Sequence, residues 1–206
     1  MREHFDRLLN VKELILAYKP LTILEVGAAM GGNTIKLLRL QHDFPFKLVT
    51  ISDNDIEDSF CEVRNAHGNG DYRWNKGISY ELIPKLIDGT VNMAIMDTDH
   101  NYWTLKKELD AIYPKMNKIC LIVFHDTYIN AYNDGLTDND NCTDIHLRKT
   151  GEGCSPYPRE EIMASEKKGL VPAILDFMGE HPEFYILRYT LESNGAMCIA
   201  RGHKPI

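Results

Sequence analysis

The feature that most constrains this chain is an alternation of short apolar runs with segments of helical periodicity. Four of the runs are rich in β-branched residues, and each ends at or just before a glycine or an acidic residue. These runs cover residues 21–27, 46–52, 91–97 and 119–126. Apolar residues at helical spacing fill much of the intervals, over residues 33–40, 79–87 and 103–116. Such alternation predicts a parallel sheet with helices on both faces and functional groups at the carboxyl ends of its strands.

Each end of the chain adds elements to this pattern. Val11, Leu14 and Ile15 lie at helical spacing, so we expect an N-terminal helix over residues 1–19. Near the C-terminus the pattern predicts a helix and two strands, over residues 169–182, 183–191 and 196–200. A short polar turn with a glycine joins the two strands, which predicts an antiparallel pair at one end of the sheet.

Length and composition limit the number of domains and the classes of partner. The 206 residues suffice for one domain with a sizeable core, so we predict a single domain over residues 1–206. A net charge of −7 argues against duplex nucleic acid as a partner. No stretch approaches the ~20 apolar residues of a membrane span, so we expect no membrane partner. Five scattered cysteines without a CxxC pair favour a reducing, cytoplasmic location.

Two segments lie outside the expected core. Residues 129–168 lack clear periodicity, and a long irregular segment of this kind is usually either a lid or a disordered loop. If the segment is a lid, the strand order places it above the carboxyl ends of the strands. The N-terminal helix also lies outside the expected sheet, so it is a candidate pairing surface for a homo-oligomer.

The turn after the first run, ILEVGAAMGGNT, is a candidate cofactor site. Gly27, Gly31 and Gly32 permit a sharp turn and a close approach to a ligand, and the next helix offers free N–H groups. A dinucleotide fingerprint is matched only in degenerate form, as Gly27, Ala29 and Gly32. Glu25 would repel a pyrophosphate but attract the positive groups of S-adenosylmethionine, which favours the methyl donor. A glycine-rich turn without a ligand is the alternative.

Further candidate contacts to such a cofactor follow the later runs. An acidic side chain after the second strand can accept hydrogen bonds from ribose hydroxyls, which points to Asp53, or to Ser52 if the register shifts by one residue. Ser79, at the start of the segment SYELIPKLI, could lie beside an adenine. It could equally be a helix N-cap, which is the commoner use of such a serine.

Ionisable residues gather where the third and fourth apolar runs end. The third run ends in IMDTDHNYW, with Asp97, Asp99 and His100 inside four positions, and the fourth ends in His125 and Asp126. Carboxylates at adjacent strand ends can supply oxygen ligands to a divalent cation, and a histidine with a pKa near ~6.5 suits a general base. The alternatives are a polar loop and a capped turn.

The flanking residues of this segment have two interpretations each. Asp99 either orients His100 or is a solvated loop charge, and the second is the commoner case. Tyr102 and Trp103 either line an acceptor pocket or belong to the core, and aromatic residues at the start of a helix more often belong to the core.

The blocks LEVGAAMGGNT, IMDTDHNYWTLKKELDAIYPKM and LIVFHDTY, in this order, resemble the class I S-adenosylmethionine-dependent methyltransferases. The chain is most similar to the branch that includes macrolide sugar O-methyltransferases and cephalosporin-hydroxylase-like proteins. The resemblance covers residues 20–128 and returns in GLVPAILDFMGEHPEF and the closing hairpin. Together with the alternation, it predicts an α/β fold: a doubly wound, mostly parallel, seven-stranded Rossmann-like sheet with an antiparallel C-terminal hairpin.

The resemblance also implies roles for individual residues. Cofactor contacts would come from Glu25, Gly27, Ala28, Gly31, Asn33, Thr34, Ser52, Asp53, Ser79 and Asp97, with Asn33 also expected to cap its helix. Metal ligands would be Asp97, His125 and Asp126, and the catalytic residues would be His100, as general base, and Asp97. The chain departs from the pattern at Ser52, where the ribose acid usually stands, and at His125, where relatives more often carry Glu or Asp.

Together these features predict an S-adenosylmethionine-dependent O-methyltransferase assisted by a divalent metal, Mg²⁺ or another cation. Its acceptor would be a small hydroxylated molecule such as a sugar or glycan unit, because metal contact lowers the pKa of a hydroxyl and a nearby base removes the proton. Two rival functions are an NAD-type Rossmann oxidoreductase and a non-catalytic cofactor-binding protein of the same fold.

Overall fold

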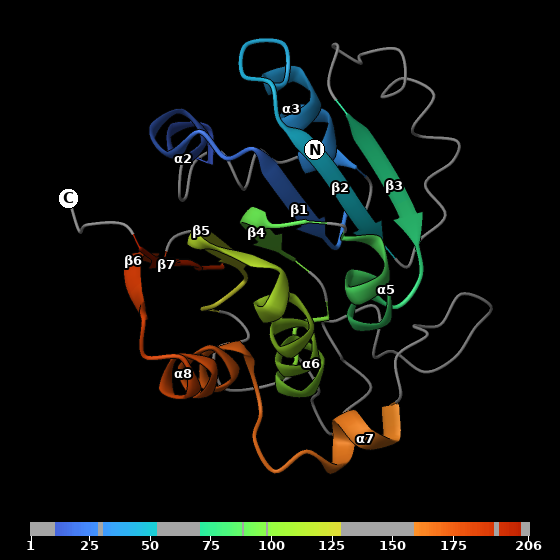
Figure 1. Ribbon diagram of the computed structural model, residues 1–206. Coiled ribbons are helices and arrows are strands. Elements are labelled where there is room, and N and C mark those ends of the chain that lie inside the picture. The colour runs from blue at the N-terminus through green and yellow to red at the C-terminus, as the bar shows by residue number, and fades with distance from the viewer. Residues whose placement is uncertain are drawn as a thin grey trace.

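A seven-stranded sheet forms the centre of the protein in the computed structural model (Figure 1). The structure describes residues 11–28, 31–52, 71–87, 89–97, 99–128, 159–191 and 194–202. The strands are β1 (Thr22–Val26), β2 (Lys47–Ser52), β3 (Tyr72–Lys76), β4 (Val91–Met96), β5 (Met116–His125), β6 (Phe184–Thr190) and β7 (Ala196–Arg201). Their order is β3-β2-β1-β4-β5-β7-β6, and β7 runs antiparallel to the other six strands. The predicted fold class is confirmed.

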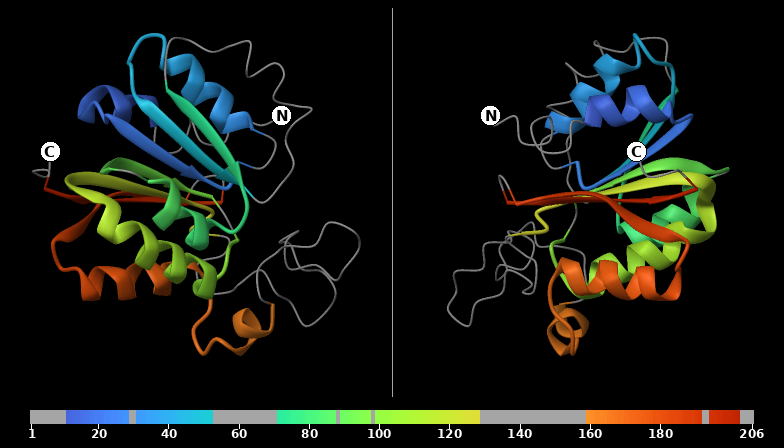
Figure 2. Two further views of the ribbon diagram at one scale, coloured as in Figure 1. Left: turned by 45° about the vertical axis from the view of Figure 1, so that its right-hand side comes forward. Right: turned by 90° about the vertical axis from the view of Figure 1, so that its left-hand side faces the viewer.

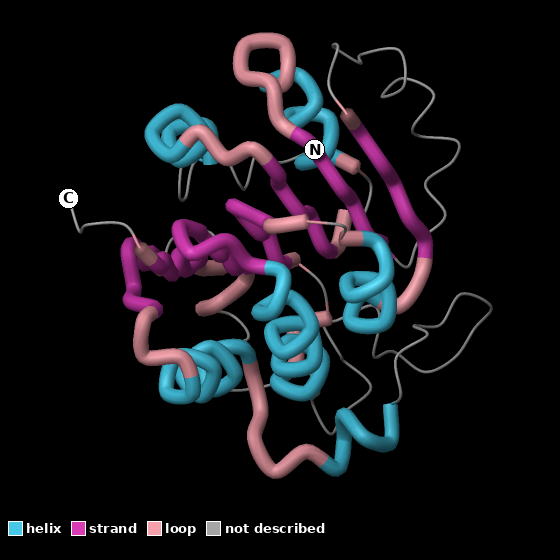
Figure 3. Tube along the Cα trace, in the orientation of Figure 1, coloured by secondary structure: helices cyan, strands magenta, loops and turns pink. Residues whose placement is uncertain are grey.

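Helices cover both faces of this sheet (Figures 2 and 3). One layer contains α2 (Val11–Tyr18) and α3 (Gly32–Leu40), and the other contains α5 (Ser79–Leu86), α6 (Tyr102–Ile112) and α8 (Leu170–Glu180). A 3-10 turn, η1 (Tyr113–Lys115), joins α6 to β5. The short helix α7 (Arg159–Ala164) lies beyond the second layer, away from the sheet (Figure 2). None of the helices in the described ranges is long and apolar enough to cross a membrane.

The central strands are mostly apolar because both of their faces are largely buried. Successive side chains of a strand point to opposite faces, so β1 contributes to two hydrophobic clusters. Ile23 packs in the cluster that includes Leu14 of α2 and Leu38 of α3. Leu24 packs in the cluster that includes Leu109 of α6. All five side chains are at most 2% exposed, which fixes the register of the sheet and the positions of its strand ends.

Several elements differ from the sequence-based expectations. The apolar runs locate six strands, and the seventh is β3, whose sequence YRWNK is half-exposed at the sheet edge and contains no apolar run. Within the segment expected to be irregular, residues 159–164 form α7. The expected N-terminal helix is present over residues 11–18, while residues 1–10 and 129–158 lie outside the described residues. The two strands of the predicted hairpin do pair antiparallel.

Candidate functional site

Three neighbouring strands bring their carboxyl ends to one edge of the sheet. Val26 at the end of β1 pairs with Met96 of β4, and Met96 pairs in turn with Phe124 of β5. The residues that follow are therefore neighbours, and the Asp97 amide donates to the Val26 carbonyl at 2.9 Å. Strand order reverses between β1 and β4, which is the position where open parallel sheets bind ligands.

The turn after β1 needs glycine at two of its three glycine positions. Gly27 has φ 84° and Gly31 has φ 74°, a region that side chains with a Cβ rarely adopt. Gly31 is the N-cap of α3 and has no side-chain cap, so the expectation that Asn33 caps this helix is wrong. The chain turns through a left-handed residue at Gly31, which places Asn33 inside the helix. A Cβ on Gly32 would meet no described atom within 4 Å, so local packing does not require that glycine.

Glu25 lies beneath this turn, near the end of β1. Its carboxylate is 1% exposed, and Oε2 accepts hydrogen bonds from Thr34 Oγ1 at 2.7 Å and Thr50 Oγ1 at 2.9 Å. Oε1 is buried and has no hydrogen-bond partner within the described ranges. Burial and, to a smaller extent, the negative charge of Asp97 raise the pKa of Glu25 to about 7. The hydrogen bonds from the two hydroxyl groups act in the opposite direction and lower it.

The surroundings of Glu25 fit a cationic ligand. A buried carboxylate oxygen without a partner carries a desolvation cost that an ammonium or sulfonium group would offset. The N–H groups at the start of α3 are next to it and can hold the ligand's carboxylate. The sequence pattern alone does not identify Thr50, whose signal is a buried polar residue within β2, on the face that it shares with Leu48 and Ser52.

The expected ribose and adenine contacts are only partly described. Ser52 ends β2 and is buried, whereas Asp53 lies outside the described residues. Ser79 is the first residue of α5, but the N-cap is Ile78, so the N-cap interpretation of Ser79 is wrong. Instead the buried Ser79 hydroxyl donates to the buried Glu108 carboxylate of α6. The adenine contact stays a prediction.

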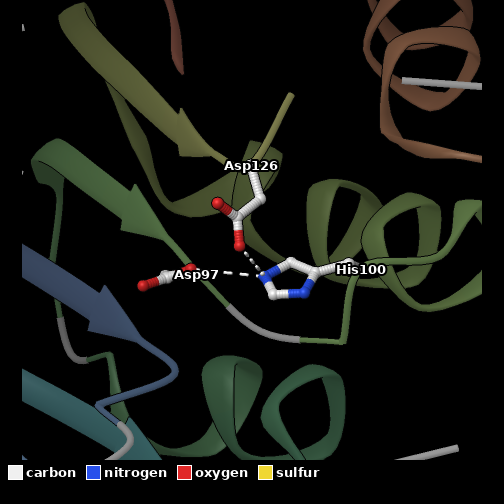
Figure 4. A group of neighbouring side chains, drawn as sticks. All are labelled: Asp97, His100 and Asp126. Carbon is white, nitrogen blue, oxygen red and sulfur yellow. Dashed lines mark hydrogen bonds and ion pairs between the residues drawn. The ribbon is translucent and has the colours of Figure 1, made fainter. Parts of the chain in front are cut away.

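A second cluster joins the ends of β4 and β5 (Figure 4). His100 Nε2 lies 3.3 Å from Asp97 Oδ1 and 3.2 Å from Asp126 Oδ2. The ligand atoms of Asp97, His100 and Asp126 all lie within 4.8 Å of one another, close enough to hold one metal ion. His125 reaches the same two carboxylates from another side, with Nδ1 3.2 Å from Asp97 Oδ1 and 3.0 Å from Asp126 Oδ1.

The backbone at Asp126 helps to form this cluster. Asp126 has φ 54°, a left-handed conformation that is uncommon for a residue with a side chain and is often found at functional sites. Because β5 ends at His125, this turn lets two consecutive side chains both reach Asp97 or its partner His100. These contacts bring His125 to both Asp97 and Asp126, while the described residues whose ligand atoms could hold one metal ion are Asp97, His100 and Asp126.

Electrostatics in the cluster are dominated by its imidazoles. Burial alone would raise the pKa of Asp97, but the hydrogen bonds and charges of His100 and His125 hold it well below its usual range. Burial alone would lower the pKa of His125, but its hydrogen bonds to Asp126 and Asp97 raise it to about 10. Without a metal, His125 is therefore protonated at neutral pH and balances a carboxylate charge.

The flanking residues are packed rather than solvated. Asp99 is 2% exposed, so the expectation of a solvated loop charge is wrong. Tyr102 donates from its hydroxyl to Asp176 Oδ2 at 2.8 Å and packs against the core. Trp103 lies edge-on to Tyr80 and packs with the buried Ile162 of α7. These contacts favour packing roles for both aromatic residues.

Comparisons with known proteins agree with this architecture. The sequence profile of a family described as methyltransferase domain matches residues 24–127, about half of the chain and nearly the whole site. A search of curated proteins gives no match. A Staphylococcus aureus protein described as a caffeoyl-CoA O-methyltransferase aligns with a TM-score of 0.61 and 17% identity, over 93% of this chain and 81% of that one.

Two further solved structures share the fold. SAH-bound PaMTH1 from Podospora anserina gives a TM-score of 0.59 at 13% identity, over 93% of this chain and 76% of that one. MycE, from the mycinamycin biosynthetic pathway and in complex with Mg, SAH and mycinamycin VI, gives 0.57 at 16% identity. The alignment covers 97% of this chain but 49% of MycE. At such identities these likenesses establish the fold.

Proposed function

The chain belongs to the methyltransferase domain family, and from this premise we propose that it is an S-adenosylmethionine-dependent O-methyltransferase assisted by a divalent metal. The proposed acceptor is a small hydroxylated molecule such as a sugar or glycan unit. One observation carries the proposal: a buried carboxylate suited to a cation, Glu25, adjoins the cluster of Asp97, His100 and Asp126 at one sheet edge.

The methionine end of the cofactor would be held at the glycine turn. Glu25 Oε1 would accept from the amino group, and the left-handed Gly27 and Gly31 keep the backbone clear of it. The N–H groups at the start of α3 would donate to the carboxylate. Ser52 or Asp53 would bind the ribose. SAH bound to PaMTH1 and MycE, which have this fold, supports the proposal.

The acceptor would be activated by the second cluster. Asp97, Asp126 and a histidine would hold a divalent cation, which would supply Lewis-acid chemistry that lowers the pKa of an acceptor hydroxyl. His100 Nε2 would take the hydroxyl proton, and the adjacent Asp97 and Asp126 carboxylates would stabilise the imidazolium that forms. The acceptor oxygen would then form a C–O bond to the methyl carbon in line, and the C–S bonding pair would leave with sulfur. Mg in the MycE complex supports a metal of this kind.

The remaining parts of the proposal concern the setting of the enzyme. A net charge of −7 supports a small-molecule rather than nucleic-acid partner. Buried free thiols at Cys120 and Cys198 are compatible with a reducing, cytoplasmic location. A single domain over residues 1–206 is part of the same proposal.

Two measurements test the proposed function. Calorimetric titration should show binding of S-adenosylhomocysteine and no binding of NAD, because Glu25 repels a pyrophosphate. Methyl transfer from labelled S-adenosylmethionine to a panel of sugars and catechols should then be lost after chelation and return on addition of a divalent cation. Binding of NAD alone would contradict the cofactor assignment, and full methyl transfer in EDTA would contradict the role of the metal.

A further inference from the structure

Two imidazoles and two carboxylates alternate in the cluster at the ends of β4 and β5. Asp97 Oδ1 is within 3.3 Å of a nitrogen of both His100 and His125. Asp126 contacts the same two histidines through different oxygens, Oδ2 to His100 at 3.2 Å and Oδ1 to His125 at 3.0 Å. The potential metal ligands of this site are therefore two residues with nitrogen donors and two residues with oxygen donors.

The spacing of these atoms is that of ligands around a small dication. Metal–nitrogen and metal–oxygen bonds of about 2.1 Å place neighbouring ligand atoms about 3.0 Å apart in an octahedron and about 3.4 Å apart in a tetrahedron. The four nitrogen–oxygen contacts lie between 3.0 and 3.3 Å. A metal ion would take the place of the shared protons, and the ligand atoms of Asp97, His100 and Asp126 already lie within 4.8 Å of one another.

We propose that this site selects a dication of the Mn²⁺ to Zn²⁺ series over Mg²⁺, and that His125 makes the selection. This inference rests on the proposed function, since it concerns the metal of the same site. It assigns His125 the role of a nitrogen ligand beside Asp97 and Asp126. An oxygen-donor residue in its place would make the site a hard-cation site.

Ligand chemistry is the first reason for this selection. Carboxylate oxygen serves all of these cations, but imidazole nitrogen suits Fe, Co, Ni, Cu and Zn and is an unusual ligand for Mg²⁺. Affinity for such donors rises along the series from Mn²⁺ to Cu²⁺. Two candidate nitrogen donors, in His100 and His125, therefore favour a transition metal more than the carboxylates do.

The limited access of solvent is the second reason. Mg²⁺ gives up its water reluctantly and usually keeps several waters. The side chains of His125, Asp126 and Asp97 are only 10%, 13% and 21% exposed, so few waters can reach their ligand atoms. An ion that accepts fewer waters and more protein ligands fits this enclosure better. The two carboxylates also balance the double charge once both histidines are neutral.

Metal binding to the purified full-length protein, stripped with a chelator and free of cofactor, tests this inference. Mn²⁺ binding is followed by loss of the free-ion electron paramagnetic resonance signal, and Mg²⁺, Co²⁺ and Zn²⁺ are added as competitors. We expect Mg²⁺ to compete at least about 100-fold more weakly than Co²⁺ or Zn²⁺. Pulsed measurements on bound Mn²⁺ should show hyperfine coupling to imidazole nitrogen.

Variants assign the selection to His125. His125→Asp should lower the preference for Co²⁺ over Mg²⁺ by about 10- to 100-fold and weaken the nitrogen coupling. His42→Asp, an exposed histidine after α3, is the matched control and should leave both unchanged. If His125→Asp does not fold, His125→Asn offers a smaller change with the same expected direction, and the nitrogen coupling of the wild type is an independent readout.

The possible results separate this inference from the proposed function. Equal binding of Mg²⁺ and Co²⁺, an unchanged preference in folded His125→Asp, or failure of every dication to bind would overturn it. If no dication binds, the positive charge at this site would be that of protonated His125 and not that of a metal. Binding of S-adenosylhomocysteine is measured in parallel without metal, so a failure of the methyltransferase proposal is recognised separately.

Discussion

Glu25 and Asp97 lie at the ends of neighbouring strands, yet their surroundings shift their pKa values in opposite directions. Glu25 is enclosed with two hydroxyl donors, and burial raises its pKa to about 7. Burial also opposes ionisation of Asp97, but two histidines reverse the effect and hold its pKa well below the usual range. The protein thus supplies imidazole partners to Asp97, whereas Glu25 Oε1 has no hydrogen-bond partner among the described residues.

This difference suggests two kinds of binding step. A cationic cofactor at Glu25 would complete a site that is otherwise destabilised by its buried charge. A metal at Asp97 would instead have to displace protons that already hold the cluster together. Substitutions at Glu25 and in the Asp97 cluster can therefore test the two regions separately.

Removal of the candidate base should affect turnover alone. In His100→Ala we expect kcat for methyl transfer to fall about 10²- to 10⁴-fold, because the proposed base that takes the acceptor proton is removed. The affinity for S-adenosylhomocysteine should stay within about twofold, since the cofactor residues lie at the other carboxylate. Steady-state kinetics measures kcat, and calorimetry measures the affinity for S-adenosylhomocysteine, with His42→Ala as control. A parallel loss of cofactor affinity would contradict the base assignment.

Neutralising Glu25 should weaken cofactor binding. In Glu25→Gln we expect the affinity for S-adenosylhomocysteine to fall about 10- to 100-fold, which corresponds to a lost hydrogen bond between charged groups. Wild-type affinity should rise as pH rises through about 7, since Glu25 binds the cofactor's ammonium group only when ionised, and this rise should be absent in the variant. Glu13→Gln, on the exposed face of α2, is the control. An unchanged affinity would remove Glu25 from the cofactor site.

The same substitution should stabilise the folded protein. Because the folded pKa of Glu25 is raised from 4.5 to about 7, folding takes up a proton in this interval and stability decreases as pH rises through it. Glu25→Gln removes this loss, so its advantage in free energy of unfolding should approach about 3 kcal/mol above pH 7 and shrink toward pH 5. Urea unfolding at the two pH values measures the difference. A destabilised variant at pH 8 would contradict this account of the buried charge.

The histidine cluster should show the opposite pH dependence. Because the folded pKa of His125 is raised from 6.5 to about 10, its stabilising effect is complete below pH 6.5 and is lost as pH rises through 10. In the metal-free protein, His125→Gln should cost about 1.5–3 kcal/mol at pH 6.5 and much less at pH 10.5. Urea unfolding with His42→Gln as control provides the measurement. A cost that does not depend on pH would indicate lost packing instead of a lost charge.

The two glycines of the cofactor turn provide the smallest and most local test. Gly27→Ala should cost about 1–2 kcal/mol, because φ 84° brings a Cβ against the backbone. Gly32→Ala should leave stability unchanged or raise it by up to about 1 kcal/mol, because it lies at the start of α3 with open space around it. Thermal unfolding of both variants measures the two changes in stability. Equal changes would show that the turn does not depend on the left-handed conformation of Gly27.

The sequence predicts those elements in which burial controls composition. Strands covered on both faces must be apolar along their length, so β1, β2, β4 and β5 are recognisable as runs. The edge strand β3 carries no such constraint, and its sequence YRWNK gives no comparable signal. Residue type predicts a helix cap at Asn33 and offers one as an alternative at Ser79, whereas the caps are Gly31 and Ile78. Propensity for a cap does not fix the residue at which a helix begins.

The sequence by itself determined that the chain forms a doubly wound sheet and that Glu25, Asp97, His100, His125 and Asp126 lie near strand ends. The period of the apolar pattern sets element type, and parallel connection sends carboxyl ends to one edge. Only the tertiary structure decided that Thr50 meets Glu25 and that both histidines share Asp97. These contacts depend on register between strands distant in the sequence, and on the left-handed turn at Asp126, which no local pattern specifies.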